Sequence, residues 1–115
     1  MMIDCAFCKI AAEELSVKKL YDNGTILAFQ DINPKAPIHI LIIPRKHIAT
    51  LNDLASEDAG LIGQIYLAGK QLASDLGVAN SGYRTVINCN RDANQVIFHI
   101  HMHLLAGRKF SWPPG

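Results

Sequence analysis

The most informative segment of the sequence is Phe98-His99-Ile100-His101-Met102-His103-Leu104-Leu105, because polar and apolar residues alternate along it. Successive side chains of a β-strand point to opposite faces, so the three histidines share one face at roughly 6.6 Å spacing. The apolar residues between and beside them take the other face and are expected in the core: Phe98, Ile100, Met102 and Leu104. The pattern therefore predicts a strand over 96–105.

Three histidines on one strand face point to chemistry, because each uncharged imidazole needs partners for its donor and its acceptor. One interpretation is a metal site, since His-x-His can aim two imidazoles at one ion, as in His₃ zinc enzymes. The other is a nucleophilic central histidine that attacks a carbonyl or phosphoryl centre. A neutral imidazole is available near pH 7, since its unperturbed pKa is about 6.5. The spacing alone does not choose between these two chemistries.

The remaining pattern predicts an α+β fold. A short helix is expected over 5–14, and one long helix is expected to begin at Ser56-Glu57-Asp58 and to end at Gly77. Four further strands are expected over 19–21, 25–31, 38–43 and 83–88. Because no βαβ alternation occurs, we predict a five-stranded antiparallel sheet with the helices on one side. The broad apolar stripe of the long helix suggests contact with a partner chain as well as with the sheet, and packing on the core alone is the alternative.

Length and charge limit the class of protein. The chain has 115 residues, which suits a single domain over 1–115, and a formal net charge of +1. The near-neutral charge argues against a nucleic-acid binder, which normally carries a basic excess. The sequence shows neither a signal peptide nor an apolar run of membrane-spanning length, so we expect a cytoplasmic protein without a membrane partner.

The cysteines suggest a metal site. Cys5 and Cys8 form a Cys-x-x-Cys pair, which in a chain without a secretory signal indicates metal binding or redox chemistry. A thioredoxin-like redox pair is disfavoured, because no βαβ pattern follows it. Cys89 is expected to be a plain buried or half-buried thiol.

The segment His99-Ile100-His101-Met102-His103-Leu104-Leu105 matches the histidine-triad signature, in which histidines alternate with apolar residues. The segment 29–39, Gly82-Tyr83-Arg84 through Asn88, and the terminal Trp112-Pro113-Pro114-Gly115 also resemble the Hint branch of that family. The chain is thus similar, over most of its length, to the histidine triad (HIT) nucleotide-binding proteins. This resemblance implies the HIT-like fold, with the sheet continued across a homodimer.

The resemblance also implies hydrolysis of the P–N bond of purine nucleoside 5′-phosphoramidates. His101 is the implied nucleophile, which forms a nucleotidyl-histidine that water then hydrolyses. Its other ring nitrogen is implied to hold a proton on a main-chain carbonyl. His103 is implied to donate a hydrogen bond to a phosphate oxygen, and Asn88 is implied to be a further donor at the phosphate. His39 is implied to lie behind the triad as a partner of its histidines.

The resemblance places further residues at the nucleotide, which is expected to be of the AMP or GMP type. Asp31 matches the carboxylate that accepts from ribose hydroxyls, and Phe7, Phe29 and Ile32 match residues beside base and sugar. Trp112 lies in the C-terminal tail, which in this family lies near the nucleotide site of the other subunit of the dimer, so it is expected there too. Asn88, His101 and His103 contact the phosphate in the same implied scheme.

The segment before the triad departs from the family pattern. Asn94-Gln95-Val96 stands where many members have Gly-Gln-Ser, and all three positions belong to the implied nucleotide site. The family serine donates a hydrogen bond near the leaving group, which Val96 cannot do, at a cost of about tenfold to a thousandfold in rate. Asn94 replaces a glycine, so a positive φ is expected at this position, which Asn tolerates better than most residues.

Zinc is implied by the same resemblance, since some bacterial HIT proteins use a Cys-x-x-Cys pair and two histidines to hold it. The corresponding tetrahedral Cys₂His₂ site consists of Cys5, Cys8, His47 and His99, and its zinc is structural rather than catalytic. Such a site would hold the N-terminal segment against the strand that carries the triad.

Three other functions stay open from the sequence. The first is a dinucleoside polyphosphate hydrolase of the same superfamily. The leaving group of its substrate is a phosphate, so catalysis would depend less on the missing serine. The second is a nucleotide-binding or scaffold protein, in which catalysis is weak because Val96 replaces the serine. A His₃ metalloenzyme binds its metal at the triad itself.

Overall fold

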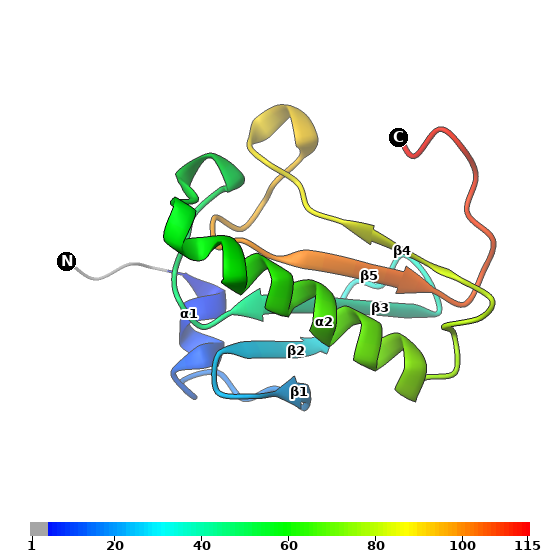
Figure 1. Ribbon diagram of the computed structural model, residues 1–115, viewed down its shortest axis with the longest axis horizontal. Helices are drawn as coiled ribbons and strands as arrows, with labels where there is room; N and C mark the ends of the chain where they lie inside the picture. The colour runs from blue at the N-terminus through cyan, green and yellow to red at the C-terminus, as the bar shows by residue number, and fades with distance from the viewer. Residues whose placement is uncertain (1–4) are drawn as a thin grey trace.

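A computed structural model describes residues 5–115 as an α+β fold (Figure 1). Its five strands are β1 (Lys19–Asp22), β2 (Ile26–Gln30), β3 (Ile38–Pro44), β4 (Tyr83–Val86) and β5 (Met102–Ala106). The helices are α1 (Ala6–Ala11) and α2 (Ala59–Asp75), with short 3₁₀ turns at Leu51–Asp53, Ser56–Asp58 and Arg91–Ala93. The strands form one antiparallel sheet in the order β1-β2-β3-β5-β4, which confirms the predicted five-stranded sheet.

The register of the central strands sets up the site. β3 pairs with β5 so that Leu41 lies opposite His103 and His39 lies opposite Leu105. These four side chains share one face, because alternate residues of a strand point the same way. On the other side of β3, Phe29 of β2 lies opposite Leu41 and continues this face.

The two faces of the sheet carry separate cores. Helix α2 lies across one face (Figure 1), where Ile65, Ala68 and Leu72 pack against alternate residues of the strands, Met102 and Leu104 among them. The opposite face packs against α1 through Phe7 and Ile10. The expectation that both helices lie on one side of the sheet was therefore wrong. The short helix supplies apolar residues that cover the strand positions facing away from α2.

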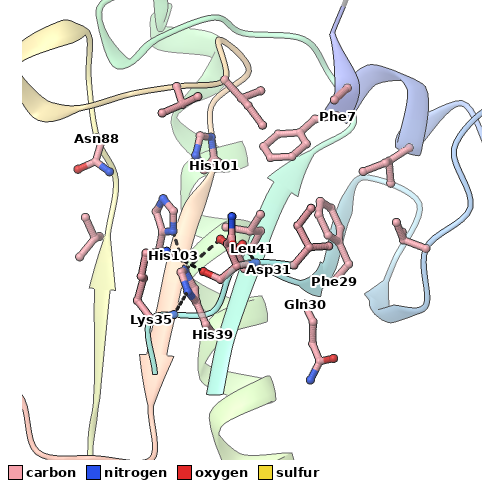
Figure 2. Close-up of a pocket in the computed structure, with 18 of the residues that line it drawn as sticks. Phe7, Phe29, Gln30, Asp31, Lys35, His39, Leu41, Asn88, His101 and His103 are labelled. Atoms are coloured by element: carbon pink, nitrogen blue, oxygen red, sulfur yellow. Dashed lines mark hydrogen bonds and ion pairs between the residues drawn. The ribbon is translucent and has the colours of Figure 1, made fainter. Parts of the chain in front are cut away.

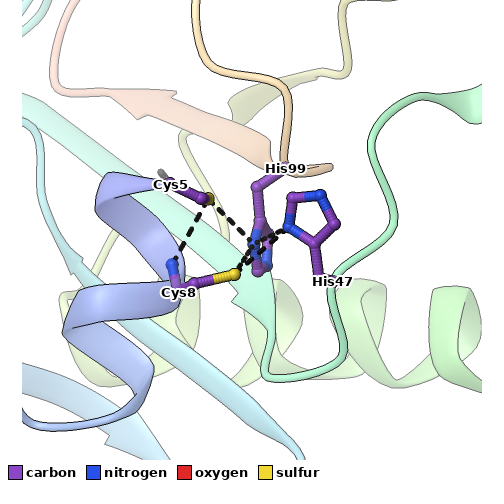
Figure 3. A group of neighbouring side chains, drawn as sticks. All are labelled: Cys5, Cys8, His47 and His99. Carbon is purple, nitrogen blue, oxygen red and sulfur yellow. Dashed lines mark hydrogen bonds between the residues drawn. The ribbon is translucent and has the colours of Figure 1, made fainter. Parts of the chain in front are cut away.

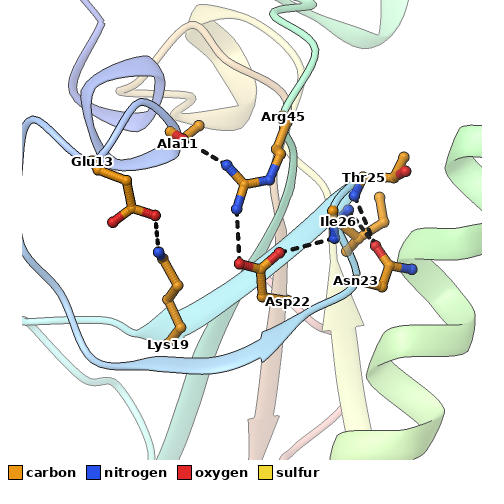
Figure 4. A network of polar contacts seen from close by, with 9 residues as sticks. Ala11, Glu13, Lys19, Asp22, Asn23, Thr25, Ile26 and Arg45 are labelled. Atoms are coloured by element: carbon orange, nitrogen blue, oxygen red, sulfur yellow. Dashed lines mark hydrogen bonds and ion pairs between the residues drawn. The ribbon is translucent and has the colours of Figure 1, made fainter.

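Helix α1 is tied to the sheet at its C-terminal end (Figure 4). The Arg45 guanidinium donates to the Ala11 carbonyl at 2.6 Å and to the Asp22 carboxylate at 2.8 Å. Glu13, which follows the helix, forms an ion pair with Lys19 at the start of β1. The end of a helix leaves carbonyls without intrahelical partners, and Arg45 satisfies one of them.

Two predicted elements begin at least three residues later in the structure than expected. The strand predicted over 96–105 begins only at Met102, because residues 96–101 have no strand partner. As a consequence Phe98 is 48% exposed and does not lie in the core, whereas Ile100, Met102 and Leu104 are buried as predicted.

The predicted cap at Ser56 is also absent. Ser56–Asp58 forms a 3₁₀ turn, and the Asp58 carboxylate accepts from the Ala55 amide and from Lys46 instead of capping α2. Gly77 has φ +74° and ends α2 as predicted, since glycine adopts this conformation without strain.

The outer face of α2 leaves apolar side chains in solvent, with Tyr66 49% and Leu67 63% exposed in the single chain. The broad apolar stripe that the sequence shows is thus only partly used by the sheet, and the partner chain stays a prediction. Within residues 5–115, no helix has both the length and the apolar character that a membrane span requires.

Candidate functional site

A cavity of about 740 Å³ opens on the α1 face of the sheet (Figure 2). Its histidines, His39, His101 and His103, lie along one side, and Phe7 and Phe29 lie on the other. Apolar side chains thus face a row of imidazoles across one space. A pocket with apolar walls and a few convergent polar groups has the form of a small-molecule site.

The backbone determines which nitrogen of His101 carries the proton. His101 Nδ1 lies 2.8 Å from the carbonyl oxygen of His99, and a carbonyl can only accept. The Nδ1 atom of the neutral ring is therefore the donor, and Nε2 keeps its lone pair. His101 is buried and lines the cavity, so this lone pair is free to face a bound ligand there.

A chain of hydrogen bonds determines the tautomers of His39 and His103. The Lys35 amide donates to His39 Nδ1 at 3.0 Å, so the neutral His39 ring carries its proton on Nε2. His39 Nε2 lies 2.9 Å from His103 Nδ1 and donates to it. The remaining proton of neutral His103 therefore sits on Nε2, where it is a donor for an anionic ligand.

Burial keeps these rings neutral. Desolvation lowers the pKa of His39 and the pKa of His101 below the usual 6.5. Desolvation, together with His101 and His39 nearby, lowers the pKa of His103 to about 4. Neutral rings suit both roles, since the nucleophile needs a free lone pair and the donor a single N–H.

Asp31 contributes a carboxylate to the same site. Its Oδ1 accepts from the Asn33 amide at 2.8 Å, and its Oδ2 lies 3.4 Å from His39 Nε2. Asp31, His39 and His103 bring ligand atoms close enough for a metal ion. A metal on His39 Nε2 would require a proton on Nδ1, which would then face the Lys35 amide, a second donor. This trio is thus better described as a hydrogen-bond chain.

Most of the other residues predicted at the nucleotide do line the cavity. Asn88, Asn94, Ile32 and Val96 are among its lining residues, with Ile32 96% and Val96 77% exposed at its mouth. Asn94 has φ +62°, which matches the expected positive φ of the glycine that it replaces.

Two of the predicted residues do not line the cavity of this chain. Gln95 is buried and holds its own loop, donating to the carbonyls of Ala49 and Ile97. Trp112 is 80% exposed, with the Arg84 guanidinium 5.9 Å from its ring centroid. Their roles at a nucleotide stay predictions.

Some lining residues were not predicted from the sequence. The wall beside α1 includes Ile10, Leu15 and Val17, and Leu41 and Leu105 line the floor on the strands. The Lys35 amide was also missed, because a backbone donor carries no signal in residue type. The strand alternation that placed His103 would have indicated Leu105, since residues two apart share a face.

A second cluster joins Cys5, the N-cap of α1, and Cys8 of α1 to His47 and His99 (Figure 3). His99 Nδ1 lies 3.5 Å from each sulfur and 3.3 Å from His47 Nδ1, and the Cys8 sulfur lies 3.2 Å from His47 Nδ1. A tetrahedral zinc ion, with bonds of about 2.3 Å to sulfur and 2.0–2.1 Å to nitrogen, spaces its ligand atoms about 3.3–3.8 Å apart. Three of these spacings fall in that range and the fourth, 3.2 Å, is slightly shorter. All four ligand atoms lie within 4.8 Å of one another, so the arrangement suits one tetrahedral ion.

The chemistry of these donors also fits a cation. His99 Nε2 donates to the Pro44 carbonyl at 2.7 Å, so its Nδ1 directs a lone pair at the cluster. Burial and the neighbouring Cys5 thiol raise the pKa of Cys8 to about 11. A bound cation would lower the pKa of the Cys8 thiol and balance the negative charge of the two cysteine thiolates. Burial in the protein alone does neither. The residues could hold a metal ion.

Known proteins resemble this chain over nearly its full length. A family model described as the HIT domain matches residues 12–110. An uncharacterized HIT-like protein of Synechocystis sp. is 43% identical over 115 residues, which is all of both chains. Purine nucleoside phosphoramidase of Escherichia coli (strain K12) is 41% identical over 108 residues, 94% of this chain and 91% of that protein.

The fold is shared with solved structures as well. The HIT family hydrolase from Legionella pneumophila Philadelphia 1 has a TM-score of 0.95 at 48% identity, over 97% of this chain and 100% of the other. A histidine triad protein from Clostridium difficile has a TM-score of 0.92 at 38% identity, over 96% of both chains. With its triad, its fold and these matches, the chain belongs to the HIT domain family.

Proposed function

We propose that this protein hydrolyses purine nucleoside 5′-phosphoramidates through a nucleotidyl-histidine intermediate. The observation that carries the proposal is the hydrogen bond from His101 Nδ1 to the His99 carbonyl, which leaves Nε2 as a free nucleophile in the cavity. The similarity to the purine nucleoside phosphoramidase of Escherichia coli and to the HIT family hydrolase from Legionella pneumophila supports hydrolysis as the reaction class.

In the first step the Nε2 lone pair of His101 attacks the α-phosphorus, and a P–Nε2 bond forms. The bond between phosphorus and the amine nitrogen breaks, its electron pair stays on that nitrogen, and a proton from solvent completes the amine. In the second step water attacks phosphorus, the P–Nε2 bond breaks, and one proton is released. His101 regains its lone pair, and the product is the nucleoside monophosphate.

His103 supplies charge stabilisation in both steps. Its Nε2 proton is the donor that the chain from Lys35 and His39 leaves free. Negative charge grows on the non-bridging oxygens in the transition state, and a preorganised donor there lowers the barrier by about 3 kcal/mol. The amide of Asn88, which lines the same cavity, is proposed as a further donor.

The apolar side of the cavity suits a flat base. Phe7 and Phe29 contact each other edge to face, with centroids 5.6 Å apart, and both line the space. Purine rings pack well on such walls, and the Asp31 carboxylate is available to accept from ribose hydroxyls. The base and sugar are therefore assigned to the side of the cavity that α1 and β2 form.

Zinc is the proposed occupant of the Cys5, Cys8, His47 and His99 cluster. These residues would hold it as a closed four-ligand site, so the ion supplies cross-linking of the chain rather than a Lewis acid at the substrate. A homodimer in the cytoplasm is likewise proposed, with the exposed apolar side chains of α2 at its interface.

Steady-state hydrolysis of adenosine 5′-phosphoramidate, with His101→Ala as the matched variant, tests the proposal. We expect turnover in the wild type, none in the variant, and an adenylylated His101 in acid-quenched wild-type protein. Turnover that survives in His101→Ala would refute the nucleophile.

A dinucleoside polyphosphate hydrolase is the second candidate, because Val96 lacks a donor for an amine leaving group and a phosphate leaving group needs less help. Diadenosine polyphosphate cleavage without phosphoramidate cleavage would favour it. AMP binding without either activity would favour the scaffold, and binding of neither substrate nor AMP would remove the nucleotide function altogether.

A further inference from the structure

We propose that metal binding at the Cys/His cluster and nucleotide binding in the cavity are energetically coupled, through the Phe7 ring and through the His99 backbone. The inference rests on the proposed function for the identity of the two ligands, zinc and a nucleotide. The coupling itself rests on contacts that join the cluster to the cavity.

The first connection is the Phe7 side chain. Phe7 lies between Cys5 and Cys8 in sequence, is only 3% exposed, and forms part of the cavity wall. Its ring centroid lies 5.1 Å from that of His101 and 5.9 Å from that of His99, in edge-to-face geometry. A metal that holds both cysteines therefore also holds the residue that contacts the nucleophile.

The cluster holds the end of α1 that carries Phe7. An isolated helix of six residues is too short to persist by itself. Its C-terminal end is fastened by Arg45, which donates to the Ala11 carbonyl (Figure 4). Its N-terminal turn is capped by the Cys5 sulfur, which accepts from the Cys8 amide (Figure 3). Loss of the metal would thus loosen the turn that carries Phe7 before it loosens the far end.

The second connection is His99, which faces both sites. Its imidazole Nδ1 belongs to the cluster, while its carbonyl accepts a hydrogen bond from His101 Nδ1. Its Nε2 proton is bonded to the Pro44 carbonyl, which leaves the ring little freedom to move alone. A displacement of His99 on metal loss would therefore shift the carbonyl that orients the nucleophile.

The coupling is local, because the core on the α2 face does not depend on the cluster. That core consists of α2 and alternate strand residues, and none of the four cluster residues belongs to it. The metal-free protein is expected to keep its sheet and α2 while the cavity wall loosens. Coupling is reciprocal, so a nucleotide that binds better with the metal must also tighten the metal by the same factor.

The experiment measures AMP affinity by calorimetry in the zinc-loaded protein and after removal of zinc by a chelator. Zinc affinity is then measured by chelator competition, with and without saturating AMP. We expect AMP binding to weaken at least tenfold without zinc, and zinc binding to tighten by an equal factor with AMP. AMP affinity within twofold in the two forms, with far-ultraviolet circular dichroism unchanged, would overturn the proposal.

Two variants separate the metal from the fold. Cys5→Ser removes a metal ligand but keeps a hydroxyl that caps helix N-termini well, so α1 retains its cap. Cys89→Ser removes a thiol that lies outside the cluster and outside the cavity lining. We expect weak zinc and AMP binding in Cys5→Ser, measured without chelator, and wild-type values in Cys89→Ser. Loss of zinc from Cys5→Ser with AMP affinity intact would refute the coupling, even if chelation unfolds the wild type.

The outcome is separable from that of the proposed function, because AMP binding needs no turnover. Coupled binding in a protein that fails to cleave phosphoramidates would support this inference and refute the proposed reaction. Cleavage with uncoupled binding would do the reverse.

Discussion

His39→Leu tests whether His39 acts only through His103. The substitution fills a similar volume but removes the acceptor for the Lys35 amide and the donor to His103 Nδ1, which form bonds of 3.0 and 2.9 Å. Without that donor, His103 is free to place its proton on Nδ1 and lose the Nε2 donor. A net hydrogen bond contributes about 1–1.5 kcal/mol, so the ratio of the competent His103 tautomer to the other should fall roughly tenfold, and kcat should fall by up to about tenfold.

A double-mutant cycle with His103→Leu supplies the control. Removing the donor itself should lower kcat by about 10²–10³. If His39 works through His103, the double variant should be no slower than His103→Leu, within about threefold. Phosphoramidate turnover is the first assay, and AMP affinity gives the same cycle without chemistry. Losses that multiply, to about 10³–10⁴ in the double variant, would refute the hydrogen-bond chain as the route of action.

Three further predictions concern the rim, the loop and pH. Val96→Ser should raise kcat for amine leaving groups about tenfold and leave dinucleoside polyphosphate cleavage within about threefold, as parallel kinetics on both substrates would show. Gly107→Ala places a Cβ 2.8 Å from Pro37 Cβ at φ +95°, so urea unfolding should show a loss of about 1–3 kcal/mol. His103 has a folded pKa of about 4 against 6.5, so the unfolded chain binds more protons between these values and stability falls as pH drops through this window. The loss should be about 1–2 kcal/mol for this screened, half-buried ring, and His103→Asn should remove it from urea titrations at pH 7 and pH 4.5.

The sequence predicted the sheet and most of the site because its strongest patterns are local. Alternation along 99–105 put His101 and His103 on the face that became the cavity, and it did so although β5 itself begins only at Met102. An extended segment alternates its side chains whether or not a neighbouring strand pairs with it. The end of the pairing, in contrast, depends on β3 and was not visible locally. The predicted placement of Phe98 failed for that reason.

Local sequence patterns are enough to identify the histidine row, the Cys5-x-x-Cys8 pair and the stop of α2 at Gly77. The partners of each histidine ring, in contrast, depend on the tertiary structure. The His39–His103 bond joins residues 64 positions apart, and the His99–Pro44 bond joins residues 55 apart. A neutral imidazole has one donor and one acceptor, and only a fixed carbonyl or amide beside it decides which nitrogen is which. Those backbone groups come from distant strands and loops, so the donor and acceptor nitrogens of each ring become distinct only in the folded chain.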